Sequence, residues 1–595
     1  MKQSTNPADL KQTLYIIKRL WPYIWVDQST RRYVTMAMLS VGLMILCNLL
    51  TPIVFRAIIN QLSLPSLENS QHYIIMLALL YAAIWTAGKM SSQLQEVVMF
   101  KPMEQGVYQL SLKLFTHLIN LSLDFHKGRK TGVIASSLER AGHALPNILW
   151  GLLLFIIPTV VEIAGVTILI TWWYGWNYGL VILCTILGYG FYSIKSTNSM
   201  VTSYRQYNIV RADVSNQLVD TLLNYETVRY FNNQEYEHLR ADALLIKQRE
   251  AGILARMSLS LIGLWQYVIV GIGLLILTIW SGVNVYKGLL SVGDFVLING
   301  YILQFVTPLN STGYFVRKMR ESVTSMEQII QLLDVKPDII DSTNARPLDR
   351  SQPLSITFKD VSFGYTNERP ILNSINFTIP AGATAALVGP TGSGKSTIAR
   401  LLFKFYQPTQ GSIYIGSQNI ADVTQASLEQ AIGVVPQDTV LFNNTIYYNI
   451  AYGNPLASRE QVEQAARMAE LEYFISQLPD GYQTMVGERG LKLSGGEKQR
   501  IAIARVILKN PSIYIFDEAT SALDTVTESS IVENMHAISA GTTTVIVAHR
   551  LSTIVYADII IVLKDGQVAE QGSHEQLLAQ NGLYAKLWHE QTQTH

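Results

Sequence analysis

The sequence has little cysteine and little charge. Its two cysteines, Cys47 and Cys184, both lie in apolar runs, so the sequence indicates neither a structural disulfide nor a cysteine metal site. Only 15% of the residues are Asp, Glu, Lys or Arg, whereas soluble domains carry about 25%. Together with a hydrophobic content of 49%, this excludes a purely soluble enzyme, a disordered protein and a disulfide scaffold.

The few charges are unevenly distributed. Residues 1–330 contain 26 Lys and Arg against 18 Asp and Glu, whereas residues 331–595 contain 19 against 26. The net charge of +1 therefore combines a basic half with an acidic half, and the total is no guide to partners. A basic, charge-poor half followed by an acidic half of ordinary composition predicts a membrane domain joined to a soluble one. We expect membrane lipid as a partner and no nucleic acid.

Apolar runs divide the first half into spans. A spanning helix needs about 20 mostly apolar residues, and stretches without Asp, Glu, Lys or Arg cover 33–55, 69–88, 163–194, 257–286 and 295–316. The region 144–194 is too long for one span and contains an aromatic cluster at 172–178, which is typical of a membrane interface. We divide this region into two helices joined by a tight outer turn, so the sequence predicts six spans.

Lys and Arg residues predict the orientation. They are concentrated before the first span and in the connections 101–143 and 195–256, whereas the alternate loops carry only Lys287. Since these residues favour the cytoplasmic side, both termini are expected there. The expected organisation is a cytoplasmic segment 1–32, a six-span domain 33–330 with long cytoplasmic helical extensions, a linker 331–353 and a soluble domain 354–595. No cleavable signal peptide is expected, because the first long apolar run begins near residue 33.

Glu162 is the one carboxylate that we place within a predicted span. An ionisable group inside a membrane is a functional hypothesis by default, because it is costly to keep there. The alternative is a packing or hydrogen-bonding role between helices. We favour this alternative, because an aromatic interface begins only ten residues later.

The soluble half contains a phosphate-binding loop. The strand pattern Ala385–Val388 runs into GPTGSGKST, which fits GxxxxGK[ST] and precedes an amphipathic helix. The glycines let backbone N–H groups surround phosphate oxygens, and the helix directs its positive end at them. The motif predicts that Lys395 reaches the β- and γ-phosphates and that Ser396 ligates Mg²⁺. The nucleotide-binding residues of this loop are Gly389, Pro390, Thr391, Gly392, Ser393, Gly394, Lys395, Ser396 and Thr397.

A second apolar strand, Ile513–Phe516, ends in Asp517 and Glu518. Phosphoryl transfer needs a group that holds the metal and a group that orients the attacking water. We assign the metal to Asp517 and the water to Glu518. ATP and Mg²⁺ are the expected ligands of this α/β domain.

Between these motifs lies LSGGE at residues 493–497, and here the chain resembles ATP-binding-cassette (ABC) transporters, whose signature this is. The resemblance covers the whole chain, because six spans followed by one cassette is the layout of an exporter half-transporter. It implies a multidomain membrane protein, with a six-helix all-α transmembrane domain followed by an α/β P-loop nucleotide-binding domain. The loop 487–490 (GERG) is typical of exporters in the family.

The resemblance also assigns roles. It implies that Tyr365 stacks on adenine, that Gln437 is a catalytic residue beside the metal, and that the catalytic His549 senses the γ-phosphate. Further nucleotide contacts are implied for Ser494, Gly495, Gly496, Glu497 and, in the loop 521–524, Asp524. In the family the signature turn meets ATP held by the opposite subunit. One chain supplies one cassette, so the resemblance implies a homodimer.

The run Asp220–Asn233 (DTLLNYETVRYFNN) resembles one exporter subgroup, the mitochondrial iron–sulfur-linked and bacterial heavy-metal-tolerance exporters. This resemblance implies ATP-driven export of glutathione-derived thiol compounds by alternating access, namely conjugates, metal–glutathione or persulfide species. Residues 121–132 and 224–231 resemble the segments that couple the cassette to the membrane helices.

The subgroup's substrate residues match this sequence only in part. Its paired arginines fall at Met200 and Tyr204, so that pair is missing here. In the last span, Gln304 is taken to share a face with the matching Asn299 and Gly300. These polar groups could instead hydrogen-bond between helices. The implied substrate residues are Gln266, Asn299, Gly300, Gln304 and Arg205.

Two other functions are open at this point. A broader exporter or flippase of lipids or amphipathic drugs is favoured if the missing arginines make the cavity less anion-binding. An ATP-gated channel or regulatory subunit is disfavoured by the complete hydrolytic machinery, Glu518 included. The N-terminal segment lacks a clear transit peptide, which favours a bacterial inner membrane over a mitochondrial one.

Overall fold

The computed structural model describes residues 10–25, 27–63, 71–128, 131–366, 369–517, 533, 535–548 and 554–592. The chain divides into two compact units, Met1–Lys336 and Pro337–His595. The division falls inside the predicted linker.

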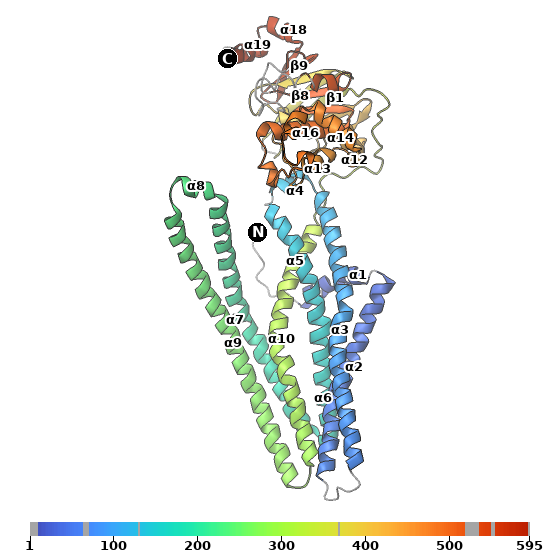
Figure 1. The fold of residues 1–595 in the computed structure, drawn as a ribbon, viewed down its shortest axis with the longest axis vertical. Helices are drawn as coiled ribbons and strands as arrows, with labels where there is room; N and C mark the ends of the chain where they lie inside the picture. The colour runs from blue at the N-terminus through green and yellow to red at the C-terminus, as the bar shows by residue number, and fades with distance from the viewer. Residues whose placement is uncertain are drawn as a thin grey trace. The chain divides into compact units, whose positions relative to one another are not determined.

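The described residues of the first unit form helices only (Figure 1). Two long helices, α7 and α9, run side by side, and the short α8 joins them at one end (Figure 1). The helices are α1 (Leu10–Ile24), α2 (Gln28–Leu62), α3 (Gln71–Ile119), α4 (Leu123–Gly128), α5 (Thr131–Leu149), the π-helix η1 (Trp150–Ile156), α6 (Ile157–Tyr174), α7 (Trp176–Leu223), α8 (Tyr225–Tyr230), α9 (Gln234–Tyr286) and α10 (Val292–Leu333).

Helices lie at all six predicted span positions. Within the described ranges, four helical segments are long and apolar enough to cross a membrane, namely Gln28–Leu62, Gln71–Ile119, Glu139–Tyr174 and Gln234–Tyr286. The helix α10 begins with a shorter apolar stretch, Val292–Val306, and α7 covers the predicted fourth span.

The predicted extensions and the predicted tight turn are both present. The helices α3, α7 and α9 contain 49, 48 and 53 residues. At 1.5 Å per residue they are about 70–80 Å long, more than twice the 30 Å of a hydrocarbon core. The turn between the third and fourth spans is Gly175 alone, whose φ of 92° favours glycine. The π-helix η1, which joins α5 to α6, was not indicated by any pattern in the sequence.

The second unit contains two sheets. An antiparallel sheet has the strand order β2-β1-β4-β5, and a six-stranded sheet has the order β10-β9-β3-β8-β7-β6, in which only β10 is antiparallel to its neighbour. The strands are β1 (Ile356–Phe363), β2 (Leu372–Ile379), β3 (Thr384–Val388), β4 (Gln410–Ile415), β5 (Gln418–Asn419), β6 (Ile432–Val435), β7 (Ile513–Asp517), β8 (Thr543–Val547), β9 (Ile559–Lys564) and β10 (Gln567–Gly572).

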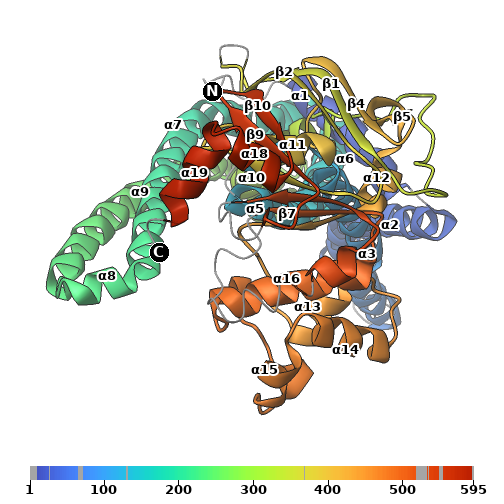
Figure 2. The ribbon, with the colours of Figure 1, turned by 90° about the horizontal axis from the view of Figure 1, so that it is seen from above.

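Helices cover the six-stranded sheet. The group α13, α14 and α16 lies on the face away from β1, β2 and β4 (Figure 2). The helices of this unit are α11 (Lys395–Leu402), α12 (Gln425–Ala431), α13 (Ile446–Ala451), α14 (Arg459–Met468), α15 (Glu472–Ser476), α16 (Gly495–Lys509), α18 (His574–Ala579) and α19 (Leu583–Thr592), with 3-10 turns η2 (Ile420–Asp422), η3 (Gly481–Gln483) and η4 (Glu488–Gly490).

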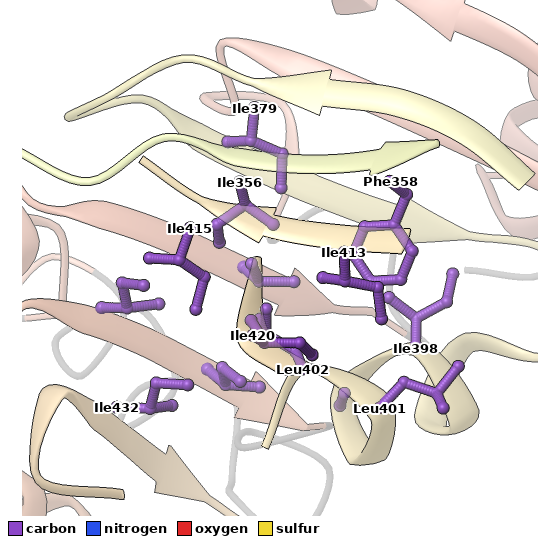
Figure 3. Packing of buried hydrophobic residues seen from close by; sticks show 14 of the residues in the cluster. Ile356, Phe358, Ile379, Ile398, Leu401, Leu402, Ile413, Ile415, Ile420 and Ile432 are labelled. Atoms are coloured by element: carbon purple, nitrogen blue, oxygen red, sulfur yellow. The ribbon is translucent and has the colours of Figure 1, made fainter. Parts of the chain in front are cut away.

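The helix α11 is held by the core between the two sheets. Its Ile398, Leu401 and Leu402 are at most 1% exposed and lie among side chains of β1, β4 and β6 (Figure 3). Burying an aliphatic side chain of this size contributes about 1.5–3 kcal/mol. The packing therefore fixes the position of α11, and with it the loop that precedes α11.

Candidate nucleotide site and membrane polar residues

The loop 389–394 has the backbone that a phosphate loop requires. Gly389, Gly392 and Gly394 have φ values of 151°, 86° and 104°, a region that residues with a Cβ rarely adopt. A Cβ on Gly389 would also collide with the backbone oxygen of Leu563. The loop joins β3 directly to α11, so the helix N-terminus faces the space that the loop surrounds.

Polar side chains of this loop are positioned for an anion. Lys395 Nζ donates to the carbonyl oxygens of Gly389 at 2.7 Å and Pro390 at 3.2 Å, so the ammonium lies over the loop. The hydroxyl of Ser393 is buried and has no hydrogen-bond partner among the described residues. A buried polar atom without a partner is costly. Both features fit a loop whose remaining partners are phosphate oxygens.

Tyr365 lies beside the start of α11. Its hydroxyl is 3.2 Å from Thr397 Oγ1 and accepts a hydrogen bond from Arg400 Nη1 at 2.9 Å. The rings of Phe363 and Tyr406 make edge-on contacts with it, each with a 5.1 Å centroid separation. These contacts orient the Tyr365 ring, yet the residue is still 40% exposed. An exposed ring beside a phosphate loop is suited to stacking on a base.

The strand register brings Asp517 to the same sheet edge as the loop. Val547 of β8 pairs with Asp517 on one side and with Leu387 on the other. Two strand spacings, about 10 Å, therefore separate Asp517 from the strand end that precedes Gly389. Side chains alternate along β7, and Ile515 packs in the same core cluster as α11, so Asp517 points to the α11 face.

Gln437 comes two residues after β6 and is exposed at this edge, since Val435 pairs with Phe516. Ser396 is the second residue of α11. Mg²⁺ prefers oxygen ligands and usually shares them with substrate phosphates. The oxygens of Ser396, Gln437 and Asp517 at one edge fit such an ion.

The signature forms a capped helix start. Ser494 is the N-cap of α16: its Oγ accepts from Glu497 N at 3.3 Å, and Glu497 Oε2 accepts from Ser494 N at 2.7 Å. This reciprocal pair is a capping box. Ser494 and Gly495 are exposed, so the helix N-terminus is accessible to an anion. The preceding exporter loop contains η4, and its Gly487, which caps η4, and Gly490 have φ values of 77° and 75°.

A buried hydrogen-bonded pair, Arg505 and Asn449, which we call the hub, joins the signature helix to the segment after Gln437. Arg505 of α16 donates from Nε to the Asn449 carbonyl at 2.7 Å and from Nη2 to Asn449 Oδ1 at 2.8 Å. Asn449 is fully buried and also bonds the backbone of Phe442 and Thr445. Burial lowers the pKa of Arg505, because its charge is desolvated. Sequence reasoning missed this pair, and no local pattern marks it.

Three predicted site residues lie outside the described residues. Glu518, Asp524 and His549 follow the ends of β7 and β8, and their positions are not described. Their roles stay predictions.

In the first unit the predicted substrate residues are bonded between helices. Gln266 Nε2 on α9 donates to Ser193 Oγ on α7 at 2.8 Å. Thr278 Oγ1 on α9 donates to Asn299 Oδ1 on α10 at 2.5 Å. These contacts are the interhelical hydrogen bonds that the sequence left as the alternative interpretation. Among these partners, Ser193 and Thr278 were missed.

Gln304 and Glu162 form a third interhelical contact. Gln304 Nε2 on α10 donates to Glu162 Oε1 on α6 at 2.5 Å, and the buried Glu162 also bonds the Asn48 side chain of α2. This is the hydrogen-bonding role that we favoured for Glu162. The prediction that Gln304 shares a face with Asn299 is wrong, because Asn299 faces α9 whereas Gln304 faces α6 and α2. Five residues correspond to about 140° around a helix, so only Gly300 and Gln304 align.

The remaining substrate positions lie on α7. Arg205 is exposed, Tyr204 is half-buried and Met200 is buried. The two predicted coupling segments contain the short helices α4 and α8, each at the end of long helices (Figure 1).

Comparison with known proteins agrees with this geometry. The family described as ABC transporter matches residues 372–521, and the family described as ABC transporter transmembrane region matches residues 34–309.

Relatives match over nearly the whole chain. The "ATM1-type heavy metal exporter" of Novosphingobium aromaticivorans is 40% identical, over 98% of this chain and 97% of the relative. The "Iron-sulfur clusters transporter atm1, mitochondrial" of Neurospora crassa is 40% identical, over 99% of this chain and 83% of the relative. A solved structure, "Structure of a bacterial Atm1-family ABC exporter with ATP bound", is similar with a TM-score of 0.85 and 40% identity, over 94% of this chain and 99% of that chain.

Proposed function

The chain belongs to the ABC transporter family as an exporter half-transporter, and on this premise we propose that it moves glutathione-derived thiol compounds out of the cytoplasm by alternating access. It is an integral membrane protein that couples ATP hydrolysis to transport. The bacterial relatives support an inner-membrane location. The proposed substrates are glutathione conjugates, metal–glutathione complexes or persulfide species.

One observation carries the substrate proposal. The similarity to an exporter named for heavy metals extends over 98% of this chain, so it includes the membrane helices as well as the cassette. Cassettes resemble one another whatever the cargo, whereas the membrane helices make the cargo pathway. Amide side chains on apolar helices, Gln266, Asn299 and Gln304, support a pathway for a polar cargo.

We propose a homodimer as the working unit. The chain carries one phosphate loop and one signature turn, and the signature turn is exposed. The helix α8 and its flanks expose large apolar side chains, such as Leu223 at 81%, Tyr230 at 78% and Phe231 at 71%. Exposed apolar groups gathered at one helical tip favour docking on a protein surface. A second copy of this chain supplies both a partner for the signature and a surface for α8.

The residues at the sheet edge have different proposed roles in ATP binding and hydrolysis. Backbone N–H groups of the loop and Lys395 hold the phosphates, and Ser396, Gln437 and Asp517 are the proposed holders of Mg²⁺. A bound Mg²⁺ neutralises charge that develops on the phosphate oxygens. Glu518 is the proposed base for the attacking water, and His549 the proposed γ-phosphate sensor.

The side chains at the expected substrate positions predict the affinity for free glutathione. Met200 and Tyr204 provide no cation where the subgroup has two arginines. A hydrogen bond to a charged group contributes about 1.5–3 kcal/mol, against about 1 kcal/mol for a neutral one. Since the amides of Gln266 and Asn299 must also exchange their present partners, affinity for free glutathione is expected to be weak. Burial of an apolar conjugate group would compensate.

The test is transport with defined cargo. ATPase activity and uptake into inverted vesicles are measured with oxidised glutathione, a metal–glutathione complex and an aryl–glutathione conjugate. Gln266→Ala should weaken stimulation by the transported compound severalfold. The matched control is Gln248→Ala, on the cytoplasmic extension of the same helix, and Glu518→Gln reports uptake that does not depend on hydrolysis.

A broad exporter or flippase of lipids or amphipathic drugs is the second candidate. The observation that favours it is the missing arginine pair, which leaves fewer cations for glutathione carboxylates. If a lipid or drug is taken up while none of the three thiol compounds is, this candidate replaces the first. ATP-dependent conductance without vectorial uptake would instead indicate a channel.

A further inference from the structure

Polar side chains of two other helices, α2 and α6, contact Asp294 of α10 at one end of the membrane unit. Arg56 Nε of α2 lies 2.6 Å from Asp294 Oδ1, and the Tyr174 hydroxyl of α6 donates to the same oxygen at 2.7 Å. The side chain of Asp294 is 8% exposed and that of Arg56 is 33% exposed. Contacts from a cation and a hydroxyl to one carboxylate are strong and directional.

Further contacts hold the same elements together. Asn60 Oδ1 of α2 accepts from Gly293 N at 2.9 Å, and a Cβ on Gly293 would collide with the Arg56 carbonyl oxygen. Glycine thus allows α2 and α10 to approach closely at this point. The Arg56 guanidinium also lies 5.4 Å from the centroid of the Trp173 ring of α6. Asp294 in addition caps α10 with Ser291, so its carboxylate is oriented from both sides.

These contacts lie at the end of α10 that is far from the residue where the chain enters the second unit. Asp294 is the third residue of α10, and the second unit begins four residues after Leu333, the other end of that helix. About 60 Å of helix separate the two ends. Arg56 lies in the last two turns of α2, and Tyr174 is the last residue of α6. All three helices are therefore joined at their outer ends.

We infer that Arg56, Asp294 and Tyr174 form a latch that keeps the outer side of the exporter closed and that must open before cargo leaves. An exporter with alternating access has to close one side while the other is open. Because Arg56 and Asn60 both lie on α2 and contact neighbouring residues at the start of α10, a shift of α2 by a few ångströms breaks the ion pair and the Asn60–Gly293 bond together. Tightly packed helices of this kind switch between two discrete arrangements and do not deform continuously from one to the other.

The expected effect of removing the latch is a change in population. Losing a charge-assisted contact shifts an equilibrium by roughly tenfold or more. Arg56→Gln should therefore raise the outward-open fraction about tenfold without nucleotide. Substrate-free ATPase should rise and transport per ATP hydrolysed should fall, each severalfold. Arg56→Lys, which keeps the cation, should restore most of the wild-type behaviour.

Distances between spin labels test the latch directly. Labels at Leu62→Cys, the last residue of α2, and Leu289→Cys, in the turn just before α10, are exposed and outside the latch, and they report the separation of the outer ends of these helices. Cys47 and Cys184 are replaced by alanine, and labelled chains are diluted with unlabelled chains so that one labelled copy is measured per dimer. The full-length protein is compared without nucleotide and with ATP in the Glu518→Gln background.

We expect one short distance without nucleotide, a longer one with ATP, and the longer one in Arg56→Gln and Tyr174→Phe even without nucleotide. The matched control is Tyr178→Phe, since the Tyr178 hydroxyl bonds Asn284 and joins α7 to α9 instead. Tyr174→Phe removes a single oxygen, so it keeps the test decisive if Arg56→Gln does not fold. An unchanged distance with ATP, or Arg56→Lys behaving like Arg56→Gln, would overturn the latch. No cargo is used, so this result is independent of the proposed substrate.

Discussion

Replacing Asn449 by alanine should destabilise the cassette through loss of the hub that joins α13 to α16. The side chain of Asn449 makes four hydrogen bonds: its Oδ1 accepts from Phe442 N at 2.9 Å and Arg505 Nη2 at 2.8 Å, and its Nδ2 donates to the carbonyls of Phe442 and Thr445 at 3.0 Å each. Asn449 is 0% exposed, so water does not replace the lost partners.

The magnitude follows from the groups left without a partner. The carbonyl of Thr445 keeps its bond from Asn449 N, and the carbonyl of Phe442 keeps its bond from Asn444 N. The Phe442 N–H and one guanidinium N–H of Arg505 are left unsatisfied. A buried unsatisfied group costs about 1–3 kcal/mol, and more when charged, so the expected loss is about 3–5 kcal/mol. For a unit of this size that corresponds to roughly 10 °C in Tm.

The assay is thermal unfolding of the purified full-length protein, followed by ATPase activity at a permissive temperature. Asn449→Asp keeps both acceptor bonds and adds a charge opposite Arg505, but its second oxygen faces the carbonyls of Phe442 and Thr445 instead of donating to them, so it should lose less Tm than Asn449→Ala while remaining below the wild type. The matched control is Asn454→Ala, whose side chain is exposed and, among the described residues, bonds only the local backbone N–H of Leu456. A Tm loss below about 3 °C for Asn449→Ala, where 10 °C is expected, or an equal loss in the aspartate variant, would refute the reasoning.

Three further predictions concern hydrolysis. Glu518→Gln should retain ATP yet lose nearly all turnover, because an amide does not accept the water's proton; phosphate release at the wild-type rate would contradict the assigned base. Chains carrying Lys395→Ala and Ser494→Arg should each be inactive alone but regain activity when mixed, because the mixed dimer has one intact composite site; crosslinking of Ser494 to Lys395 of its own chain would argue against action in trans. Glu497→Gln should preserve the capping box and ATPase activity, whereas Glu497→Ala should cost about 1 kcal/mol of helix stability, and equal Tm values for the two variants would refute this.

Most of the architecture was predictable because its signals are local. Apolar runs and Lys and Arg counts predicted the membrane helices, and the aromatic cluster at 172–178 predicted a tight turn, which the structure places at Gly175. The strand–loop–helix order around Lys395 and the strand that ends in Asp517 were predicted to within a residue or two. These features depend on backbone and solvation preferences of neighbouring residues, which a sequence displays directly.

The candidate site was predictable in part for the same reason. A phosphate loop is one continuous segment, and its glycines are identifiable from the backbone conformation that they must adopt. Placing Asp517 beside that loop needed the strand order, since β8 lies between β7 and β3 although it follows both in the sequence.

The sequence alone determined the motifs, the helical and strand segments and the charge asymmetry of the two halves. Tertiary structure alone decided which polar side chains meet: Gln304 bonds Glu162, 142 residues away, instead of sharing a face with Asn299, and Asp294 of the last membrane helix, α10, pairs with Arg56 of α2. The physical reason is rotation, because each residue turns a helix by about 100°. Which groups of two distant helices face each other depends on how those helices pack, and packing is a property of the whole core.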